Sequence, residues 1–259
     1  MKKLLILLTL SIAFVGCVFA QAYNAAYVHQ LYAKYPTVKS DLCSSCKEWV
    51  NPYFKSIADT QLHQPKVVYY IYTKEHQNEQ IAAKIPRTGV FSAWSPVYGQ
   101  PDLSKVYYNA NKPIKGSINK LVWGHCTAWI TLAWCKNAAI FSDTQDFNEG
   151  MEVQGQNIGT EIATEEYTRD LLANNTTDSI SIWCGTFGNQ AEYSFNGITV
   201  TMPTHYWKII EYKVNGELKT EAWLMPNIVT ETRAVLPQRV ISVTDLIAKI
   251  GFNPLTTLN

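Results

Sequence analysis

His125 and a polar stripe further along the chain are the residues whose types and spacing could do chemistry. Asn157, Glu161, Glu165 and Arg169 recur at four-residue steps. Because each such step turns a helix by only about 40°, these four side chains would share one face. Imidazole accepts a proton near neutral pH, amide oxygens suit a hard divalent cation, and guanidinium binds phosphate. On spacing alone, however, an ion-paired surface helix is the simpler explanation.

The chain carries Gly124, His125, Asn148, Asn157, Gly159, Glu165 and Arg169 in this order. With these residues, this part of the chain resembles the DNA/RNA non-specific endonucleases, a family that includes secreted bacterial nucleases and mitochondrial endonuclease G. Residues 203–227 are similar to the hairpin that follows the family's site, and residues 239–252 to its closing helix. Together the similar stretches cover about residues 85 to 255, in the family's order and spacing.

The resemblance implies an α+β, ββα-metal (His-Me finger) fold and hydrolysis of DNA and RNA with Mg²⁺, for which Mn²⁺ could substitute. His125 would be the general base that activates water, and Asn157 the protein's metal ligand. Glu165 would accept hydrogen bonds from the metal's waters, Arg169 would contact the transition-state phosphate, and Asn148 would orient the imidazole. One Mg²⁺ would stabilise the departing 3′ oxygen, so the products would carry a 5′-phosphate.

The chain departs from the family at two places. Val122 and Trp123 stand where relatives usually have Asp-Arg, and Glu152 where they often have Gln. Because an arginine expected near the phosphate is absent, either another residue supplies that charge or catalysis is weaker. A catalytically impaired member that binds nucleic acid or another ligand therefore stays open as an alternative, and so does a secreted disulfide-rich interaction module.

Two other residues compete for the chemical role. His205 could act as the base, but it follows Pro203 in the similar hairpin and is expected to be structural. Cys126 next to His125 suggests a Cys-His pair, yet neighbouring residues on a strand point to opposite faces.

Residues 1–20 have the features of a signal peptide. Lys2 and Lys3 precede an apolar run, and Val18 and Ala20 suit cleavage before Gln21. The run is too short for a spanning helix, so no membrane span is expected in the mature chain, although an anchor or lipid attachment at Cys17 is an alternative. We expect a secreted chain with one domain over residues 21–259; the oligomeric state, a homodimer included, is left open.

The mature chain is nearly neutral and keeps five cysteines. Without its two leader lysines, the 22 basic residues fall to 20, against 21 acidic ones. Contact with nucleic acid must therefore be local, since a broad basic surface would need a clear positive excess. Cys43 and Cys46 are expected to form a structural disulfide, with a redox centre or half a zinc site as alternatives. Asn174 and Asn175 each begin a glycosylation sequon.

Hydrophobic patterning predicts one domain with strands, helices and no internal repeat. Strands are expected at 67–72, 90–94, 121–125, 180–184, 198–201, 206–212 and 222–225, the last two as a hairpin around Asn215-Gly216. Helices are expected at 128–140, 156–172 and 243–250, the last one capped by Ser242 and closed by Gly251. Residues 21–66 are expected to be mostly helical or irregular, and 109–119 to be a loop.

Overall fold

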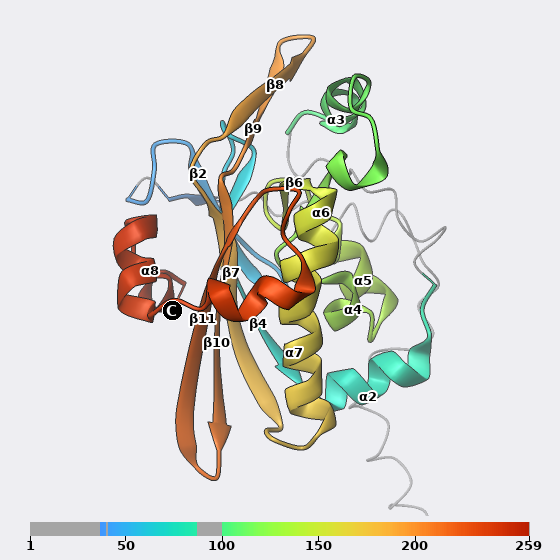
Figure 1. Ribbon diagram of the computed structural model, residues 1–259. Helices are drawn as coiled ribbons and strands as arrows, with labels where there is room; N and C mark the ends of the chain where they lie inside the picture. Colours follow the sequence, from blue (N-terminus) through green and yellow to red (C-terminus); the bar gives the residue numbers. More distant parts are fainter. Residues whose placement is uncertain (1–36, 40, 87–99, 259) are drawn as a thin grey trace, which may run out of the picture.

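A seven-stranded antiparallel sheet forms the centre of the molecule, with helices on both faces (Figure 1). The computed structural model describes residues 37–39, 41–86 and 100–258. The expected signal peptide and the strand at 90–94 lie outside these ranges. In sheet order, the strands are β1 (Thr37–Val38), β2 (Cys46–Val50), β3 (Lys55–Asp59), β4 (Gln64–Thr73), β7 (Ser179–Phe187), β10 (His205–Val214) and β11 (Glu217–Pro226).

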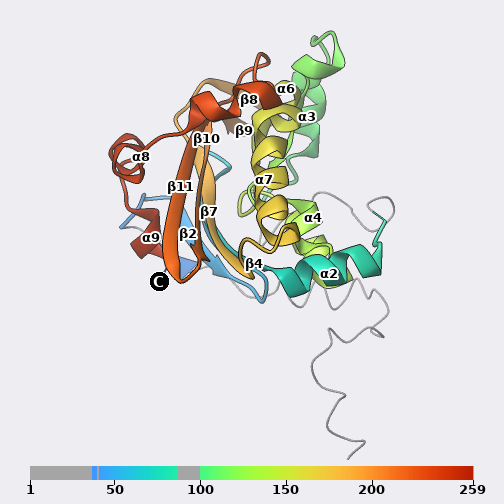
Figure 2. The ribbon, with the colours of Figure 1, turned by 60° about the horizontal axis from the view of Figure 1, so that its bottom comes forward.

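The two faces of this sheet face separate hydrophobic cores because side chains alternate along each strand. On β4, Val68, Tyr70 and Tyr72 belong to one core, whereas Val67 belongs to the other. The first core is covered by α4 (Trp129–Leu132), α5 (Lys136–Ser142) and α7 (Ile162–Ala173), and the second by α8 (Val243–Ile250) and α9 (Pro254–Thr257). The helix α2 (Lys74–Ala83) packs against α4 and α7. Figure 2 shows α8 and α7 on opposite sides of the sheet.

A two-stranded ribbon lies on the same face of the seven-stranded sheet as α7. Strands β5 (Leu121–His125) and β6 (Glu149–Val153) pair antiparallel, so that His125 lies opposite Glu149. The chain continues directly into α6 (Gln154–Gln156), a π-helical segment η2 (Asn157–Glu161) and α7. These elements form the expected ββα unit.

A third core lies beside this ribbon. It is formed with α3 (Ser104–Asn111) and the hairpin of β8 (Ala191–Phe195) and β9 (Ile198–Met202). The short 3₁₀ segment η1 (Ser117–Asn119) precedes β5 and has no buried residue. A 3₁₀ segment η3 (Arg233–Arg239) follows β11 and packs against η2 and α7. No helix among the described residues has the length and apolar character needed to cross a membrane.

The strands with clear alternation are confirmed, as are the β10–β11 hairpin and the capped helix α8. Asn215 and Gly216 both have positive φ, at 52° and 85°, as a tight hairpin turn requires. Ser242 accepts a hydrogen bond from the Asp245 backbone, and Gly251 ends α8 at φ 84°.

Three expected elements are wrong. Residues 37–66 contain β1, β2 and β3, which are short and gain their stability from pairing rather than from local pattern. The expected loop 109–119 contains the end of α3 and η1. The expected helix 128–140 is two helices, because Cys135 has extended backbone and its sulfur caps α5 by accepting from the Ala138 backbone.

Candidate active site

A cleft of about 760 Å³ lies between the β5–β6 ribbon and the helix that follows it. It is lined by Val122, Trp123, His125, Ala128, Trp129, Ile130, Asp143, Glu149, Gln154, Asn157, Ile158, Ile162, Glu165, Glu166, Arg169 and Arg233. Four of the five expected site residues are therefore in one place: His125 from a strand, and Asn157, Glu165 and Arg169 from the helical segment. Asn148 is not among the lining residues.

The His125 imidazole is held between two carboxylates. Its Nε2 lies 2.8 Å from Asp143 Oδ1 and 3.2 Å from Glu149 Oε1. Asp143 follows α5, whereas Glu149 begins β6 and is the register partner of His125. All three residues are buried, with 8%, 6% and 1% of their surfaces exposed for His125, Asp143 and Glu149.

The Asn157 side chain is oriented by a neighbouring acid. Its Nδ2 donates to Glu152 Oε2 at 2.7 Å, so the amide oxygen is the atom available to a cation. Glu152 is fully buried. A Cβ added to Gly124 would lie 2.3 Å from Glu152 Oε2. The Glu152 side chain can therefore lie this close to the backbone of residue 124 only because that residue is a glycine.

Glu165 is a carboxylate whose charged form is disfavoured in the absence of a cation. Burial raises its pKa to about 7, the negative charge of Glu161 adds to the rise, and the positive charges of Lys208, His125 and Arg169 oppose it. A divalent cation in the cleft would favour the charged form of this group.

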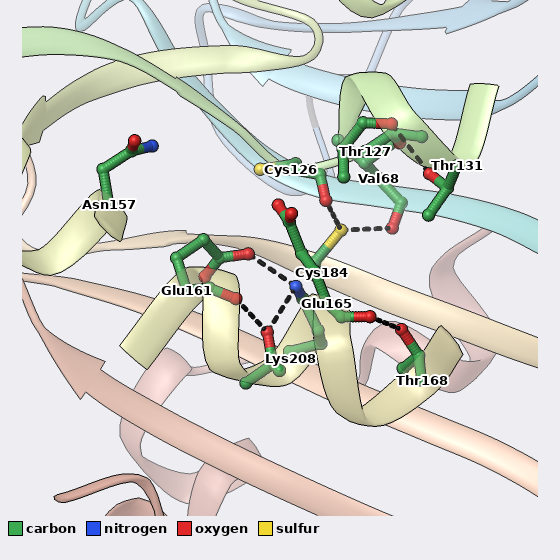
Figure 3. A network of polar contacts seen from close by, with 12 residues as sticks. Val68, Cys126, Thr127, Thr131, Asn157, Glu161, Glu165, Thr168, Cys184 and Lys208 are labelled. Carbon is green, nitrogen blue, oxygen red and sulfur yellow. Dashed lines mark hydrogen bonds and ion pairs between the residues drawn. The ribbon is translucent and has the colours of Figure 1, made fainter. Parts of the chain in front are cut away.

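A buried ion pair fixes the helical segment to the sheet. Lys208, on β10, donates from Nζ to Glu161 Oε1 at 2.5 Å (Figure 3). The same Nζ donates to Thr164 Oγ1 at 2.8 Å. The Glu161 side chain therefore lies in the protein interior. The expected polar stripe of four residues is divided, because Asn157, Glu165 and Arg169 line the cleft, whereas Glu161 does not.

The helix that was expected to be regular is distorted where the stripe begins. Gly159 has φ −96° and ψ −108°, which are not helical values, so the helix is kinked within Asn157–Glu161. This kink accompanies the division of the stripe between cleft and interior.

Asn148 is buried and bonds to backbone on both sides of the site. Its Oδ1 accepts from the Thr127 backbone N–H at 2.7 Å, and its Nδ2 donates to the carbonyls of Thr127 and Ser142 at 3.0 and 2.5 Å. Its own carbonyl accepts from the Cys126 N–H at 2.7 Å. Asn148 thus supports the backbone just after His125, while Asp143 and Glu149 contact the ring itself.

Asp143, Glu149 and Arg233 were missed by sequence reasoning. Glu149 could have been found, since it directly follows Asn148 and the ββα fold implied by the resemblance pairs two strands before the helix, as β5 and β6 do here. Asp143 and Arg233 lie in segments without periodicity, and no local signal identifies them. Arg233 is exposed and donates to both Glu166 carboxylate oxygens at 2.7 and 2.9 Å.

The two competing residues lie outside the cleft lining. Burial raises the pKa of the Cys126 thiol well above its usual value, which opposes a thiolate nucleophile. The His205 ring contacts the Thr204 hydroxyl at 2.9 Å.

The donor set suits a divalent cation. Among the described residues, the ligand atoms of His125, Asp143 and Glu149 lie within 4.8 Å of one another, a grouping that could hold a metal ion. The Asn157 amide oxygen and the Glu165 carboxylate add hard oxygen donors to the same cleft.

Comparison with known proteins identifies the fold and the family. The family model described as DNA/RNA non-specific endonuclease matches residues 37–259. No curated protein matches. A chain from a solved crystal structure of the EndoG/EndoGI complex, described as showing the mechanism of EndoG inhibition, is similar to this one, with 14% sequence identity and a TM-score of 0.57. The similarity covers 92% of this chain and 95% of that chain, and at this identity it shows the shared α+β fold alone. The family match spans most of the sequence, so the chain belongs to the DNA/RNA non-specific endonuclease family and is a nuclease, a hydrolase that acts on nucleic acids.

Proposed function

We propose that the protein is a secreted, Mg²⁺-dependent endonuclease that cleaves DNA and RNA with little sequence preference. One observation carries the proposal: His125, Asn157, Glu165 and Arg169 come from separate positions in the sequence and line a single cleft. The general base, the metal ligand, the carboxylate and the phosphate-binding arginine that phosphodiester hydrolysis needs are thus all present.

Asn157 is the proposed ligand of the metal, with Mn²⁺ as a substitute for Mg²⁺. Glu152 holds its Nδ2, which leaves the carbonyl oxygen for the cation. Mg²⁺ keeps most of its waters and takes few protein ligands, so a single amide oxygen suits it, with Glu165 accepting hydrogen bonds from its hydration shell. When bound, such an ion neutralises charge that develops on the phosphate and its 3′ oxygen.

His125 takes the proton of the attacking water. The water oxygen then bonds to phosphorus, the bond to the 3′ oxygen breaks, and the product retains a 5′-phosphate. Arg169 offers a permanently charged donor fork to the phosphate oxygens. Arg233 lines the same cleft and can supply the positive charge that Trp123 does not.

Binding of nucleic acid is local in this proposal. The mature chain is nearly neutral, so cleft residues rather than a basic surface must hold the substrate. Trp123 and Trp129 line the cleft and can stack on bases, which contributes affinity without sequence specificity. A homodimer stays a prediction that sedimentation velocity can test.

A plasmid-nicking assay tests the enzymatic function. Purified protein should nick supercoiled plasmid with Mg²⁺ and stop doing so with a chelator, and RNA should be degraded under the same conditions. His125→Ala and Asn157→Ala should each reduce the rate by at least 10²-fold, the lower end for a positioned base, while Asp170→Ala, an exposed change on the same helix, should not. Equal metal-independent activity in wild type and His125→Ala would discard the proposal.

The impaired-member alternative is favoured by the loss of Asp-Arg before Gly124. It predicts nucleic-acid binding without cleavage, and the same samples decide the matter by gel shift in the absence of metal.

For secretion and the 21–259 domain, N-terminal sequencing of protein recovered from the medium should show Gln21 as the first residue.

A further inference from the structure

The two nitrogens of the His125 ring have different surroundings. Nε2 is within hydrogen-bond distance of Asp143 Oδ1, at 2.8 Å. Nδ1 has no hydrogen-bond partner among the described residues and is not among the buried unsatisfied atoms, so it is open to the cleft. A neutral imidazole carries its proton on one nitrogen only, and a carboxylate acceptor at Nε2 keeps the proton there. The lone pair is then on Nδ1, the nitrogen that faces the cleft.

We propose that Asp143 is the positioning residue for His125, forming a carboxylate–imidazole pair that makes Nδ1 the general base. The inference rests on the proposed function and assigns a role to a residue outside the family motif that the sequence displays. In the reaction, Nδ1 takes one proton from the attacking water, Nε2 keeps its own, and Asp143 makes and breaks no covalent bond. The carboxylate stabilises the imidazolium that forms, and the proton is afterwards returned to solvent or to the departing 3′ oxygen.

Asp143 is held in place by a loop with many fixed points. Asn148 donates to the Ser142 carbonyl at 2.5 Å, and the Leu103 N–H donates to Gln145 Oε1 at 3.0 Å. His63 Nδ1 lies 2.9 Å from Asp146 Oδ2. A carboxylate on such a support holds a fixed geometry toward its partner, which a positioning role requires.

Glu149 is the weaker candidate for this role. Its Oε1 is 3.2 Å from Nε2, longer than the Asp143 contact, and its position is set by pairing in β6. The charged groups that face His125 are Asp143 from the loop after α5, Glu149 from β6, and Glu165 from α7. Variants of Asp143 and Glu149, the two carboxylates that contact the ring, are therefore compared to assign any change in a pH profile.

Asp143→Asn in the full protein is the decisive variant, because it removes the charge while keeping the size. We expect kcat to fall by about 10²- to 10⁴-fold, KM to change by less than about threefold, and the acid limb of the rate profile to move to lower pH. Asp143→Glu should restore part of the activity. Glu149→Gln should have a smaller effect on kcat, and Asp170→Asn, an exposed carboxylate change, should have none.

Two measurements without turnover complete the test. The ¹⁵N shifts of His125 in wild type should show the Nε2–H tautomer, and this preference should weaken in Asp143→Asn. Mn²⁺ affinity, measured by calorimetry, should be retained in Asp143→Asn and lost in Asn157→Ala.

Three results would overturn the inference: an Nδ1–H tautomer in wild type, an unchanged rate and pH profile in Asp143→Asn, or loss of Mn²⁺ binding in Asp143→Asn equal to that of Asn157→Ala. The last result would make Asp143 a metal ligand. Failure of the proposed function is distinct, since His125→Ala would then cleave like wild type whatever Asp143→Asn does.

Discussion

At the scale of single residues, Glu152 decides how the Asn157 amide is presented. Burial raises the pKa of Glu152 well above its usual value, and the negative charges of Glu161 and Glu165 act in the same direction, while the hydrogen bond from Asn157 opposes the rise. A protonated Glu152 has the shape and neutrality of Gln, the residue that relatives often have there. This departure from the family is therefore compatible with an intact metal site.

Two variants of Glu152 distinguish its role as a hydrogen-bond acceptor for Asn157 from the effect of its charge. Glu152→Gln keeps an oxygen for Asn157 Nδ2, so the dissociation constant for Mn²⁺ should change by less than about threefold. Glu152→Ala releases the amide and should weaken binding by about 10-fold or more, the usual effect of losing a residue that orients a ligand. Calorimetric titration of metal-free protein measures both, and unchanged binding in Glu152→Ala would contradict the orienting role.

Glu165 should reduce the stability of the metal-free protein above neutral pH. Its folded pKa of about 7 exceeds the usual 4.5, so the folded state binds the extra proton between these values. Stability contributed by the protonated form is present at low pH and is lost as pH rises through about 7. Glu165→Gln should thus be more stable than wild type by about 1–3 kcal/mol at pH 8 and no more stable at pH 4.

Urea denaturation with a chelator present measures this difference. Saturating Mg²⁺ should raise the free energy of unfolding of wild type at pH 8, because the metal binds the folded state only. The nuclease activity of Glu165→Gln should be lower than that of wild type. Glu217→Gln, which changes an exposed carboxylate at the start of β11, is the matched control. Equal stability of wild type and Glu165→Gln at both pH values would contradict the argument.

At the scale of elements, Gly159 allows the helical segment to approach the loop after β11. A Cβ added there would lie 2.2 Å from the Glu231 carbonyl oxygen, a backbone atom that cannot move aside alone. Gly155 has a similar contact, 2.5 Å from the Val229 carbonyl oxygen. The two glycines let α6 and η2 pack closely against the loop that leads to Arg233, a residue of the cleft lining.

Gly159→Ala should therefore change both stability and activity. We expect a loss of about 1–3 kcal/mol in the free energy of unfolding, as for other overpacked sites, and a larger loss of nuclease rate, because Asn157 lies two residues away. Guanidinium denaturation and the nicking assay at saturating Mg²⁺ measure the two effects. Ala163→Gly, in the next helical turn, should lower stability by about 1 kcal/mol through helix propensity with little effect on the rate.

At the scale of the whole molecule, the disulfide and the cleft lie on opposite faces of the sheet. Cys43 and Cys46 are joined by a disulfide, as expected, and Cys46 packs in the core that α8 covers. The ββα unit lies on the face of α7. Cys126, Cys135 and Cys184 are free thiols, so the disulfide framework of a small interaction module is not present among the described residues.

Removing this disulfide should affect stability without affecting catalysis. The loop it closes is short, with a sequence separation of 3, so the double variant Cys43→Ser/Cys46→Ser should lose about 2 kcal/mol in the free energy of unfolding. The nicking rate at 25 °C should stay within about twofold of wild type. A rate that falls in parallel with reduction of the wild-type disulfide would instead assign the pair a redox role.

The amino-acid sequence by itself determined the strands with regular alternation, the hairpin turn at Asn215-Gly216 and the capped helix α8, because these depend on near neighbours. The candidate site residues His125, Asn157, Glu165 and Arg169 came from their resemblance to the family's motif, because their helical spacing alone favours an ion-paired surface helix. The short strands β1 to β3 and the break between α4 and α5 could not be predicted, because pairing partners and packing, not local pattern, decide them.

Only the tertiary structure decided which groups meet. It placed Asp143 and Glu149 against Nε2 of His125, directed Glu161 inward to Lys208 while Glu165 lines the cleft, and brought Arg233 into the lining of the same cleft. These contacts join segments far apart along the chain through loops without periodicity, and their geometry depends on close packing at Gly124, Gly155 and Gly159. Apart from Glu149, which strand pairing places opposite His125, local sequence patterns do not identify these long-range contacts, because burial and charge compensation act only once the chain has folded.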